Sequence, residues 1–229
     1  YFDVTRGDVP VNSVDVSYEA AKGIGYIKVS KFARNTYNEF ITAIAKLKQA
    51  GCTSFVIDLR GNTGGYMDAA INMINEFMPE GRLIVYTEGK SFPRSDVYAN
   101  GTGTCKDAPI VVLTDEISAS ASEIFSGAIQ DNDRGTIIGR RTYGKGLVQT
   151  QMSLSDGSEM RLTIARYYTP SGRCIQKKYE MGNTDAYDQD IYNRYMHGEF
   201  DSADSIKMDD SLKYQTVGGR TVYGGGGIM

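Results

Sequence analysis

A serine and a lysine are the residues of this sequence whose types and settings could together do covalent chemistry. Ser120 is the middle serine of Ser118-Ala-Ser-Ala-Ser122 and follows a short apolar run, and Lys145 stands between glycines in Tyr143-Gly-Lys-Gly146. A serine at a sharp strand-to-helix turn exposes its oxygen, and the N–H of the next residue, Ala121, points to where an oxyanion would form. A lysine in an apolar cleft loses the solvation of its charged form and can then act as a general base. The pair is therefore a candidate nucleophile with its base.

Each of these residues also fits an ordinary structural role. Ser120 and Glu123 have the spacing of a capping box, in which the serine only satisfies the first N–H groups of a helix. Lysines in turns are commonly solvated surface charges. Gln149 lies four residues after Lys145, so on a regular strand both would face one side, and the glutamine amide oxygen could hold the amine. Ordinary strand polarity explains Gln149 equally well.

Other kinds of site find little support. The sequence has a single histidine, which excludes a zinc site with two or three histidines. That residue, His197, lies in a polar segment typical of a solvated surface. Cys52, Cys105 and Cys174 are odd in number and far apart, which indicates buried or incidental thiols rather than a disulfide framework. The loop Gly61-Asn-Thr-Gly-Gly65 has the setting of an anion site but fits neither nucleotide-binding pattern. Its glycines can equally present N–H groups to a carbonyl oxygen.

Composition is that of an ordinary globular protein. The 229 residues are 41% hydrophobic and 23% charged, and they are enough to bury a sizeable core. A net charge near −3 gives no reason to expect nucleic acid or an anionic membrane as a partner. No apolar run approaches the roughly 18 residues of a membrane span.

Apolar patterning predicts the elements that must position the serine and the lysine. Residues 24–140 alternate between strands and helices, which predicts an α/β core with partly parallel strands. Hairpins at the two ends of the chain, with turns at Gly7-Asp8 and Ser155-Asp-Gly-Ser158, would add antiparallel strands to that core. The expected strands are 1–18, 23–30, 54–59, 82–87, 109–113, 136–139, 147–154 and 159–168, and the expected helices are 36–50, 67–78 and one that starts near residue 120.

Three stretches carry no clear pattern. Residues 88–107 are polar and glycine-rich, show no periodicity and are expected to form an excursion over the surface. Residues 175–215 contain few aliphatic side chains and are expected to be loosely packed and helical or partly mobile. Four glycines at 224–227 forbid regular structure and would allow a close approach of two backbones.

Six motifs, in this order along the chain, resemble the C-terminal processing peptidases, or tail-specific proteases, which are serine peptidases with a Ser–Lys dyad. They are Asp58-Leu-Arg-Gly-Asn-Thr-Gly-Gly65, Ser118-Ala-Ser-Ala-Ser-Glu123, Gly127-Ala-Ile-Gln-Asp131, Tyr143-Gly-Lys-Gly146 with Gln149, Tyr168-Thr-Pro-Ser-Gly-Arg173, and the terminal Gly219-Arg-Thr-Val-Tyr-Gly-Gly-Gly-Gly-Ile228. Each motif is weak alone, but the ordered set is specific.

The resemblance implies roles for individual residues. Ser120 would be the nucleophile, Lys145 the general base and Gln149 the residue that orients the lysine. The oxyanion donors would be the N–H of Ala121 and a glycine of the Gly64-Gly65 pair, with Gly65 preferred. No metal or organic cofactor is implied, and the substrates would be the C-terminal segments of proteins or peptides.

The resemblance also implies a fold, a domain organisation and a location. The fold would be a ClpP/crotonase-like β-β-α spiral core in a single catalytic domain, 1–229, made of N-terminal strands (1–22), the α/β core (23–170) and a polar, glycine-rich end (171–229). The family usually carries a PDZ domain ahead of the segment Thr5-Arg-Gly-Asp-Val-Pro-Val11, where this chain begins, so that module is expected to be absent. Residues 179–215 match no part of the family pattern. The family works mainly outside the cytoplasm, in the bacterial periplasm or envelope or in plastid lumens.

Two other functions remain open on the sequence. The first is a catalytically silent, peptide-binding scaffold of the same fold. The second is a crotonase-type acyl-CoA enzyme, which shares a backbone oxyanion hole but leaves Lys145 and Gln149 unexplained.

Overall fold

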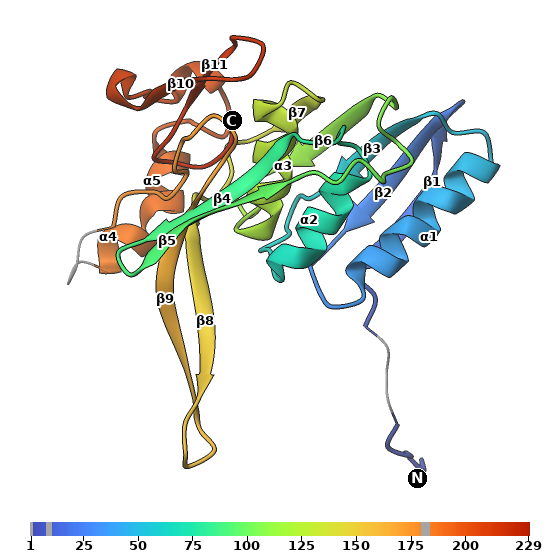
Figure 1. Cartoon of the computed structure of the whole chain (residues 1–229), viewed down its shortest axis with the longest axis horizontal. Helices are drawn as coiled ribbons and strands as arrows, with labels where there is room; N and C mark the ends of the chain where they lie inside the picture. Colours follow the sequence, from blue (N-terminus) through green and yellow to red (C-terminus); the bar gives the residue numbers. More distant parts are fainter. Residues whose placement is uncertain (1, 8–10, 180–183) are drawn as a thin grey trace.

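A five-stranded sheet forms the base of the α/β core in the computed structural model, which describes residues 2–7, 11–179 and 184–229 (Figure 1). Its strand order is β1-β2-β3-β6-β7, with β2, β3, β6 and β7 parallel and β1 antiparallel to β2 at one edge. The strands are β1 (Val14–Ala21), β2 (Ile24–Val29), β3 (Ser54–Asp58), β6 (Ile110–Thr114) and β7 (Thr136–Gly139). The predicted α/β core with partly parallel strands is confirmed.

Three helices pack on one face of this sheet. They are α1 (Thr36–Gln49), α2 (Met67–Asn75) and α3 (Ala121–Asp131). In β3, Phe55 is buried whereas the next residue, Val56, is partly exposed, as expected when helices cover one face. The Phe77 ring makes edge contacts with Phe40, Phe55 and Phe125 at centroid separations of 6.2–6.4 Å. Side chains of α1, β3 and α3 thus meet in one core.

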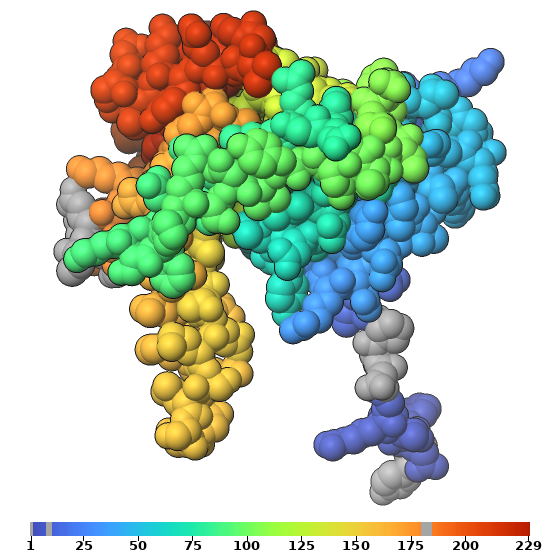
Figure 2. Space-filling view, in the orientation of Figure 1, coloured from blue at the N-terminus to red at the C-terminus, as the bar shows by residue number. Residues whose placement is uncertain are grey.

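A second sheet is antiparallel and has the order β5-β4-β9-β8. Its strands are β4 (Leu83–Gly89), β5 (Phe92–Tyr98), β8 (Leu147–Ser153) and β9 (Glu159–Tyr168). The predicted hairpin of β8 and β9 is confirmed, and it projects from the body of the protein in Figures 1 and 2. However, it pairs with β4 and does not extend the parallel sheet, so that part of the prediction is wrong. The excursion predicted at 88–107 lies at the surface, since six of the seven β5 residues are exposed, but it contains the strand β5, which the lack of periodicity did not predict.

The end of the chain contains short elements. They are α4 (Thr184–Asp188), α5 (Asp190–Met196), the 3₁₀ turns Ala203–Ser205 and Asp210–Leu212, and the strand pair β10 (Lys213–Gln215) and β11 (Thr221–Tyr223). The helical expectation for this region is met by α4 and α5, while β10 and β11 were not foreseen. The glycine run does bring backbones together, since a Cβ on Gly227 would lie 2.6 Å from the Thr142 carbonyl oxygen.

The N-terminal strands are shorter than predicted. Residues 2–7 and 11–13 have no strand structure, and the chain joins the sheet only at Val14. Asp8, the second residue of the expected turn at Gly7-Asp8, lies outside the described residues, and so does Val9. In the described part of the chain, no helix has the length and apolar character that crossing a membrane would require.

Candidate active site

Ser120 stands on a strained turn between β6 and α3. Its backbone angles are φ 56° and ψ −113°, a left-handed conformation that is costly for a residue with a side chain and common at functional turns. Ser120 is partly exposed, whereas Ser118 and Ser122 are fully buried. The Ser118 hydroxyl donates to the Leu59 carbonyl at 2.8 Å, and the Ser122 hydroxyl donates to the Asn62 carbonyl at 2.8 Å. Of the three serines, only Ser120 has the setting of an accessible nucleophile.

The glycine-rich loop after β3 packs directly against this serine turn. A Cβ on Gly64 would lie 2.7 Å from both the Ala119 carbonyl oxygen and the Ser120 Cβ, and the φ of Gly64 is +98°. Only glycine allows this approach. The loop also reaches the chain after β2, because the Phe32 N–H donates to the Gly64 carbonyl at 3.0 Å and a Cβ on Gly65 would strike the Phe32 carbonyl. The predicted proximity of the two loops is therefore present.

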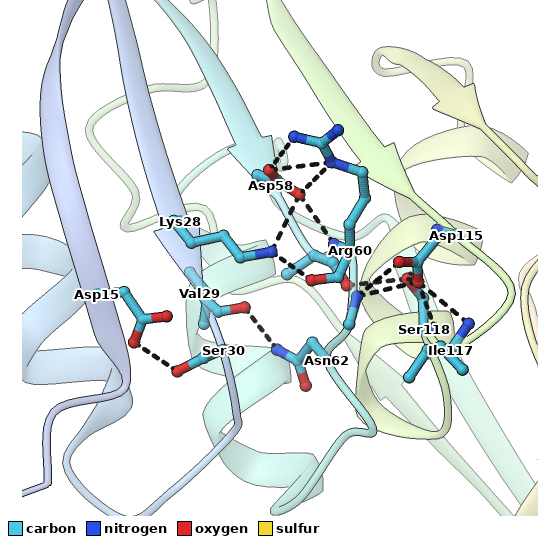
Figure 3. Close-up of polar contacts among 12 residues, drawn as sticks. Asp15, Lys28, Val29, Ser30, Asp58, Arg60, Asn62, Asp115, Ile117 and Ser118 are labelled. Atoms are coloured by element: carbon cyan, nitrogen blue, oxygen red, sulfur yellow. Dashed lines mark hydrogen bonds and ion pairs between the residues drawn. The ribbon is translucent and has the colours of Figure 1, made fainter.

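The start of the glycine loop is held by a charged cluster at the end of β3 (Figure 3). The Asp58 carboxylate is buried, lies 2.6 Å from the Arg60 guanidinium and 3.4 Å from Lys28 Nζ, and accepts the Tyr26 hydroxyl at 2.6 Å. Burial alone would raise the pKa of Asp58, but the hydrogen bonds from Arg60 and Tyr26 outweigh it and lower that pKa to about 2. Burial and the hydrogen bond to Asp58 raise the pKa of Tyr26 to about 12. Asp58 is therefore ionised over the physiological range.

The first two residues of the loop, Gly61 and Asn62, are tied to β2 and to the turn before α3. Asn62 donates through Nδ2 to the Val29 carbonyl at 2.9 Å, and its own carbonyl accepts the Ala119 N–H at 3.0 Å. Asp115 accepts the Gly61 N–H at 2.9 Å, and Figure 3 shows it facing the loop from the turn before α3. The glycine loop and the serine turn therefore form one hydrogen-bonded unit.

Lys145 is brought to the serine turn through a buried carboxylate. Oε2 of Glu123 accepts the backbone N–H groups of Ser120 and of Lys145, each at 2.9 Å. Oε1 accepts the Gly144 N–H at 2.7 Å and the Thr142 hydroxyl at 2.5 Å. Burial raises the pKa of Glu123 above its ordinary value, and these hydrogen bonds oppose that rise. The predicted capping box of Ser120 and Glu123 is present, and the same carboxylate also binds Thr142 and, in the lysine loop (residues 143–146), Gly144 and Lys145.

A tyrosine of β9 joins the same two segments. The Tyr167 hydroxyl lies 2.5 Å from the Lys145 carbonyl oxygen and 3.1 Å from the Ser120 carbonyl oxygen. Burial raises the pKa of Tyr167 well above its ordinary value, so the hydroxyl stays a donor. Glu123 and Tyr167 thus hold the backbones of the serine and the lysine from two sides.

The geometry around Gln149 differs from the expectation. The strand β8 begins at Leu147, after the lysine, and the β8–β9 register shifts between Val148 and Gln149. The two-residue alternation of a regular strand therefore does not relate Lys145 to Gln149. The exposed Gln149 side chain donates to the Thr163 hydroxyl at 3.4 Å. Its role toward the lysine stays a prediction.

Backbone N–H groups beside Ser120 differ in their availability. The Gly64 N–H already donates to the Asn62 side chain at 2.9 Å. Within residues 2–7, 11–179 and 184–229, no hydrogen bond uses the N–H of Ala121 or of Gly65. One N–H group at the start of α3 and one in the glycine loop thus have no hydrogen-bond acceptor among the described residues.

The sequence did not predict a role for Tyr167, and it did not predict that Glu123 also binds the lysine loop. A capping-box spacing signalled Glu123 only as a helix cap, and nothing in the pattern of β9 singled out Tyr167. His197 is exposed, as predicted, and none of Cys52, Cys105 and Cys174 forms a disulfide. The described residues contain no group of three His, Cys, Asp or Glu side chains that could hold a metal ion.

Comparison with known proteins agrees with the motif resemblance. The model of the family described as peptidase family S41 matches residues 23–185. The carboxyl-terminal-processing protease of Synechocystis sp. is 38% identical over 179 residues, which are 77% of this chain and 42% of that protein. A probable CtpA-like serine protease of Staphylococcus epidermidis is 36% identical over 176 residues, or 76% of this chain and 35% of that protein.

A solved structure also matches. The photosystem II D1 C-terminal processing protease superposes with a TM-score of 0.65 and 35% identity, over 75% of this chain and 47% of that one. The chain therefore spans less than half the length of these relatives. The resemblance to C-terminal processing peptidases is confirmed, and the chain belongs to peptidase family S41.

Proposed function

We propose that this chain is the catalytic domain of a serine endopeptidase that cleaves protein substrates at or near their C-termini. The observation that carries the proposal is the shared anchoring of two segments: Glu123 and Tyr167 each bind the backbone of Ser120 and the backbone of Lys145. A nucleophile and a base need such fixed relative positions, because small displacements greatly reduce the rate. Membership of peptidase family S41 supports the same assignment.

In this proposal Ser120 attacks the scissile carbonyl while the Lys145 amine takes the hydroxyl proton. The tetrahedral intermediate collapses to an acyl-enzyme as the lysine returns the proton to the leaving amine. Water, deprotonated by the same lysine, then attacks the ester. As the bond between the acyl carbon and the serine oxygen breaks, the lysine returns that proton to Ser120 and the product leaves. Gln149 is assigned the orientation of the lysine amine, which requires its side chain to turn away from Thr163. The reaction needs no metal or organic cofactor.

The oxyanion would bind the N–H groups of Ala121 and Gly65. Both are unused by other described groups and both belong to segments that pack against Ser120, one at the start of α3 and one in the glycine loop. The helix dipole of α3 adds favourable potential at the same place. Gly65 is preferred to Gly64, because the Gly64 N–H already donates to Asn62.

The proposal extends to the fold and the domain. The order of strands and crossover helices from β2 to β7 is compatible with a ClpP/crotonase-like β-β-α spiral, and we assign residues 1–229 to a single catalytic domain with a core at 23–170. An extracytoplasmic location, in the periplasm or envelope, is included on the strength of the family alone. The substrates are the unstructured C-terminal segments of proteins, which can enter a site built from loops.

A cleavage assay tests the proposal. An unstructured protein labelled at both termini is incubated with the chain, its fragments are identified by mass spectrometry, and a serine-reactive probe is used to label the nucleophile. Ser120→Ala and Lys145→Ala should abolish cleavage while the fold persists, whereas Lys46→Ala, at an exposed position on α1, should leave cleavage unchanged. Full activity of Lys145→Ala would contradict the dyad. A folded chain without turnover would indicate a silent scaffold, and acyl-CoA binding in a titration would indicate crotonase-type chemistry.

A further inference from the structure

Residues beyond the family match lie against the lysine loop. The match to peptidase family S41 ends at residue 185, yet α5 and the last residues of the chain both contact Thr142, which is three residues before Lys145. In Figure 1, α5 is the orange helix that follows α4. The last residues belong to the terminal motif Gly219–Ile228, whereas α5 lies within residues 179–215, which match no part of the family pattern.

Thr142 is the point at which these contacts converge. Its hydroxyl lies 2.5 Å from Glu123 Oε1 and 2.7 Å from the Ile228 nitrogen, so it donates to the carboxylate and accepts the Ile228 N–H. The Thr142 N–H donates to the Ile228 carbonyl at 3.0 Å. Its carbonyl oxygen accepts a hydrogen bond from Arg194 of α5 at 3.0 Å. Every polar group of this residue is therefore used, and the hydroxyl places one of the four donors on Glu123.

Arg194 binds the backbone just ahead of the lysine loop. Its side chain is only 5% exposed, and the guanidinium donates to the carbonyl oxygens of Thr142 and Arg141, the latter at 2.5 Å. Arg194 Nε also donates to Glu199 at 2.8 Å, and the same carboxylate accepts two hydrogen bonds from the Arg141 guanidinium, each at 2.6 Å. A planar guanidinium can reach two carbonyls and a carboxylate together, and a lysine ammonium cannot reproduce that geometry.

We propose that Arg194 is a positioning residue for the Ser–Lys site, acting through Thr142 and Glu123 on the loop that carries Lys145. The inference rests on the proposed peptidase function. The path is short: Arg194 fixes the Thr142 backbone, Thr142 donates to Glu123, and Glu123 accepts the N–H groups of Lys145 and Ser120. Arg194 itself does not touch the reacting atoms. The segment after residue 185 is thus a working part of the site.

The test compares three variants with the wild-type chain. Arg194→Gln removes the charge and most of the N–H donors. Arg194→Lys keeps the charge but lacks the planar guanidinium that reaches several acceptors at once. Arg220→Gln is the matched control, because Arg220 also lies after residue 185 but pairs with Asp133 at the exposed surface. kcat and KM are measured on an unstructured peptide, well below the melting temperature of each variant.

We expect Arg194→Gln to lower kcat by about 10- to 100-fold, since a displacement near 1 Å can cost about 100-fold, with KM changed by no more than about threefold. Arg194→Lys should recover part of kcat, and Arg220→Gln should match the wild type. A folded Arg194→Gln with kcat within about twofold of wild type would overturn the inference, as would equal losses in Arg194→Gln and Arg220→Gln. If Arg194→Gln does not fold, Arg194→Lys decides: a wild-type kcat in that variant overturns the inference, and a lowered kcat at unchanged KM supports it.

The two proposals fail in different ways. Absence of turnover by the wild-type chain would remove the proposed function and this inference together. Wild-type turnover with an unaffected Arg194→Gln would count against the inference alone.

Discussion

Replacing Glu123 with glutamine tests whether one buried carboxylate holds the serine turn and the lysine loop together. The wild-type carboxylate accepts four hydrogen bonds, two on each oxygen. A glutamine amide keeps one oxygen, so its NH₂ group must face two former donors. In the better orientation the oxygen stays with Ser120 and Lys145, and the Thr142 hydroxyl rotates to accept from the amide. The Gly144 N–H is then left opposite another donor.

The cost follows from these contacts. A stranded buried donor costs about 1–3 kcal/mol. The hydrogen bonds that remain lose their charged acceptor and about half of their strength, which adds about 1 kcal/mol. We therefore expect Glu123→Gln to lower the free energy of unfolding by about 2–4 kcal/mol, a large part of the 5–15 kcal/mol that is usual for a domain.

Urea unfolding followed by circular dichroism at pH 7 measures this loss. Glu159→Gln is the matched control, because Glu159 lies on the exposed part of the β8–β9 hairpin. Surface substitutions usually change the free energy of unfolding by less than about 0.5 kcal/mol. A change that small in Glu123→Gln would refute the assigned role of the carboxylate.

Two further substitutions test the glycine loop. Asp58→Asn should remove part of the pH dependence of the free energy of unfolding. Because the pKa of Asp58 is lowered to about 2, its ionised form stabilises the fold at any pH above the ordinary aspartate pKa near 4. About 2 kcal/mol of that stability is lost as the pH falls from about 4 toward 2. Urea unfolding between pH 7 and pH 2.5 should show this loss in the wild type and not in the variant, and parallel curves would contradict it. Gly64→Ala should lower stability by about 2–3 kcal/mol and peptidase kcat by at least tenfold, because the new Cβ would lie 2.7 Å from the Ala119 oxygen. Gly61→Ala is the matched control, because Gly61 also has a positive φ, +72°, but has open space where the Cβ would lie. Thermal melts and kinetics of the two variants therefore separate backbone strain from the steric clash. Equal effects of the two substitutions would refute the packing argument.

The parallel core could be predicted because its signal is local. Buried strands such as β3 and β6 are short apolar runs, and the turn residues between them mark where each helix begins. The glycine loop and the Ser118–Ser122 run could be recognised for the same reason. Their types and spacing stand in short continuous stretches, and the packing of Gly64 on Ser120 agrees with that expectation.

Pairing between distant segments could not be predicted in this way. Hydrophobic periodicity reports which side of a strand is buried, not which strand lies beside it. Six of the seven residues of β5 are exposed, so no apolar alternation marked it as a strand. The hairpin of β8 and β9 was recognised from its turn, but its pairing with β4 depends on contacts about 80 residues away in sequence. The shift in register at Gln149 leaves no signature in the sequence either.

The proposed Ser–Lys site lies where the two sheets meet, and this explains why its supports could not be predicted from the sequence. Ser120 follows β6 of the parallel sheet, whereas Lys145 precedes β8 of the antiparallel sheet. No pairing of named strands joins the two sheets. The serine and the lysine are instead related by one backbone hydrogen bond, from the Tyr143 N–H to the Ser118 carbonyl at 3.0 Å, and by side chains that cross from one segment to the other. Glu123 crosses from α3 to the lysine loop, and Tyr167 crosses from β9 to the serine turn. Both side chains are buried, which shields these hydrogen bonds from competition by water. Both contacts bind backbone atoms of residue 145 and leave its side chain out, as the proposed proton transfer by Lys145 requires.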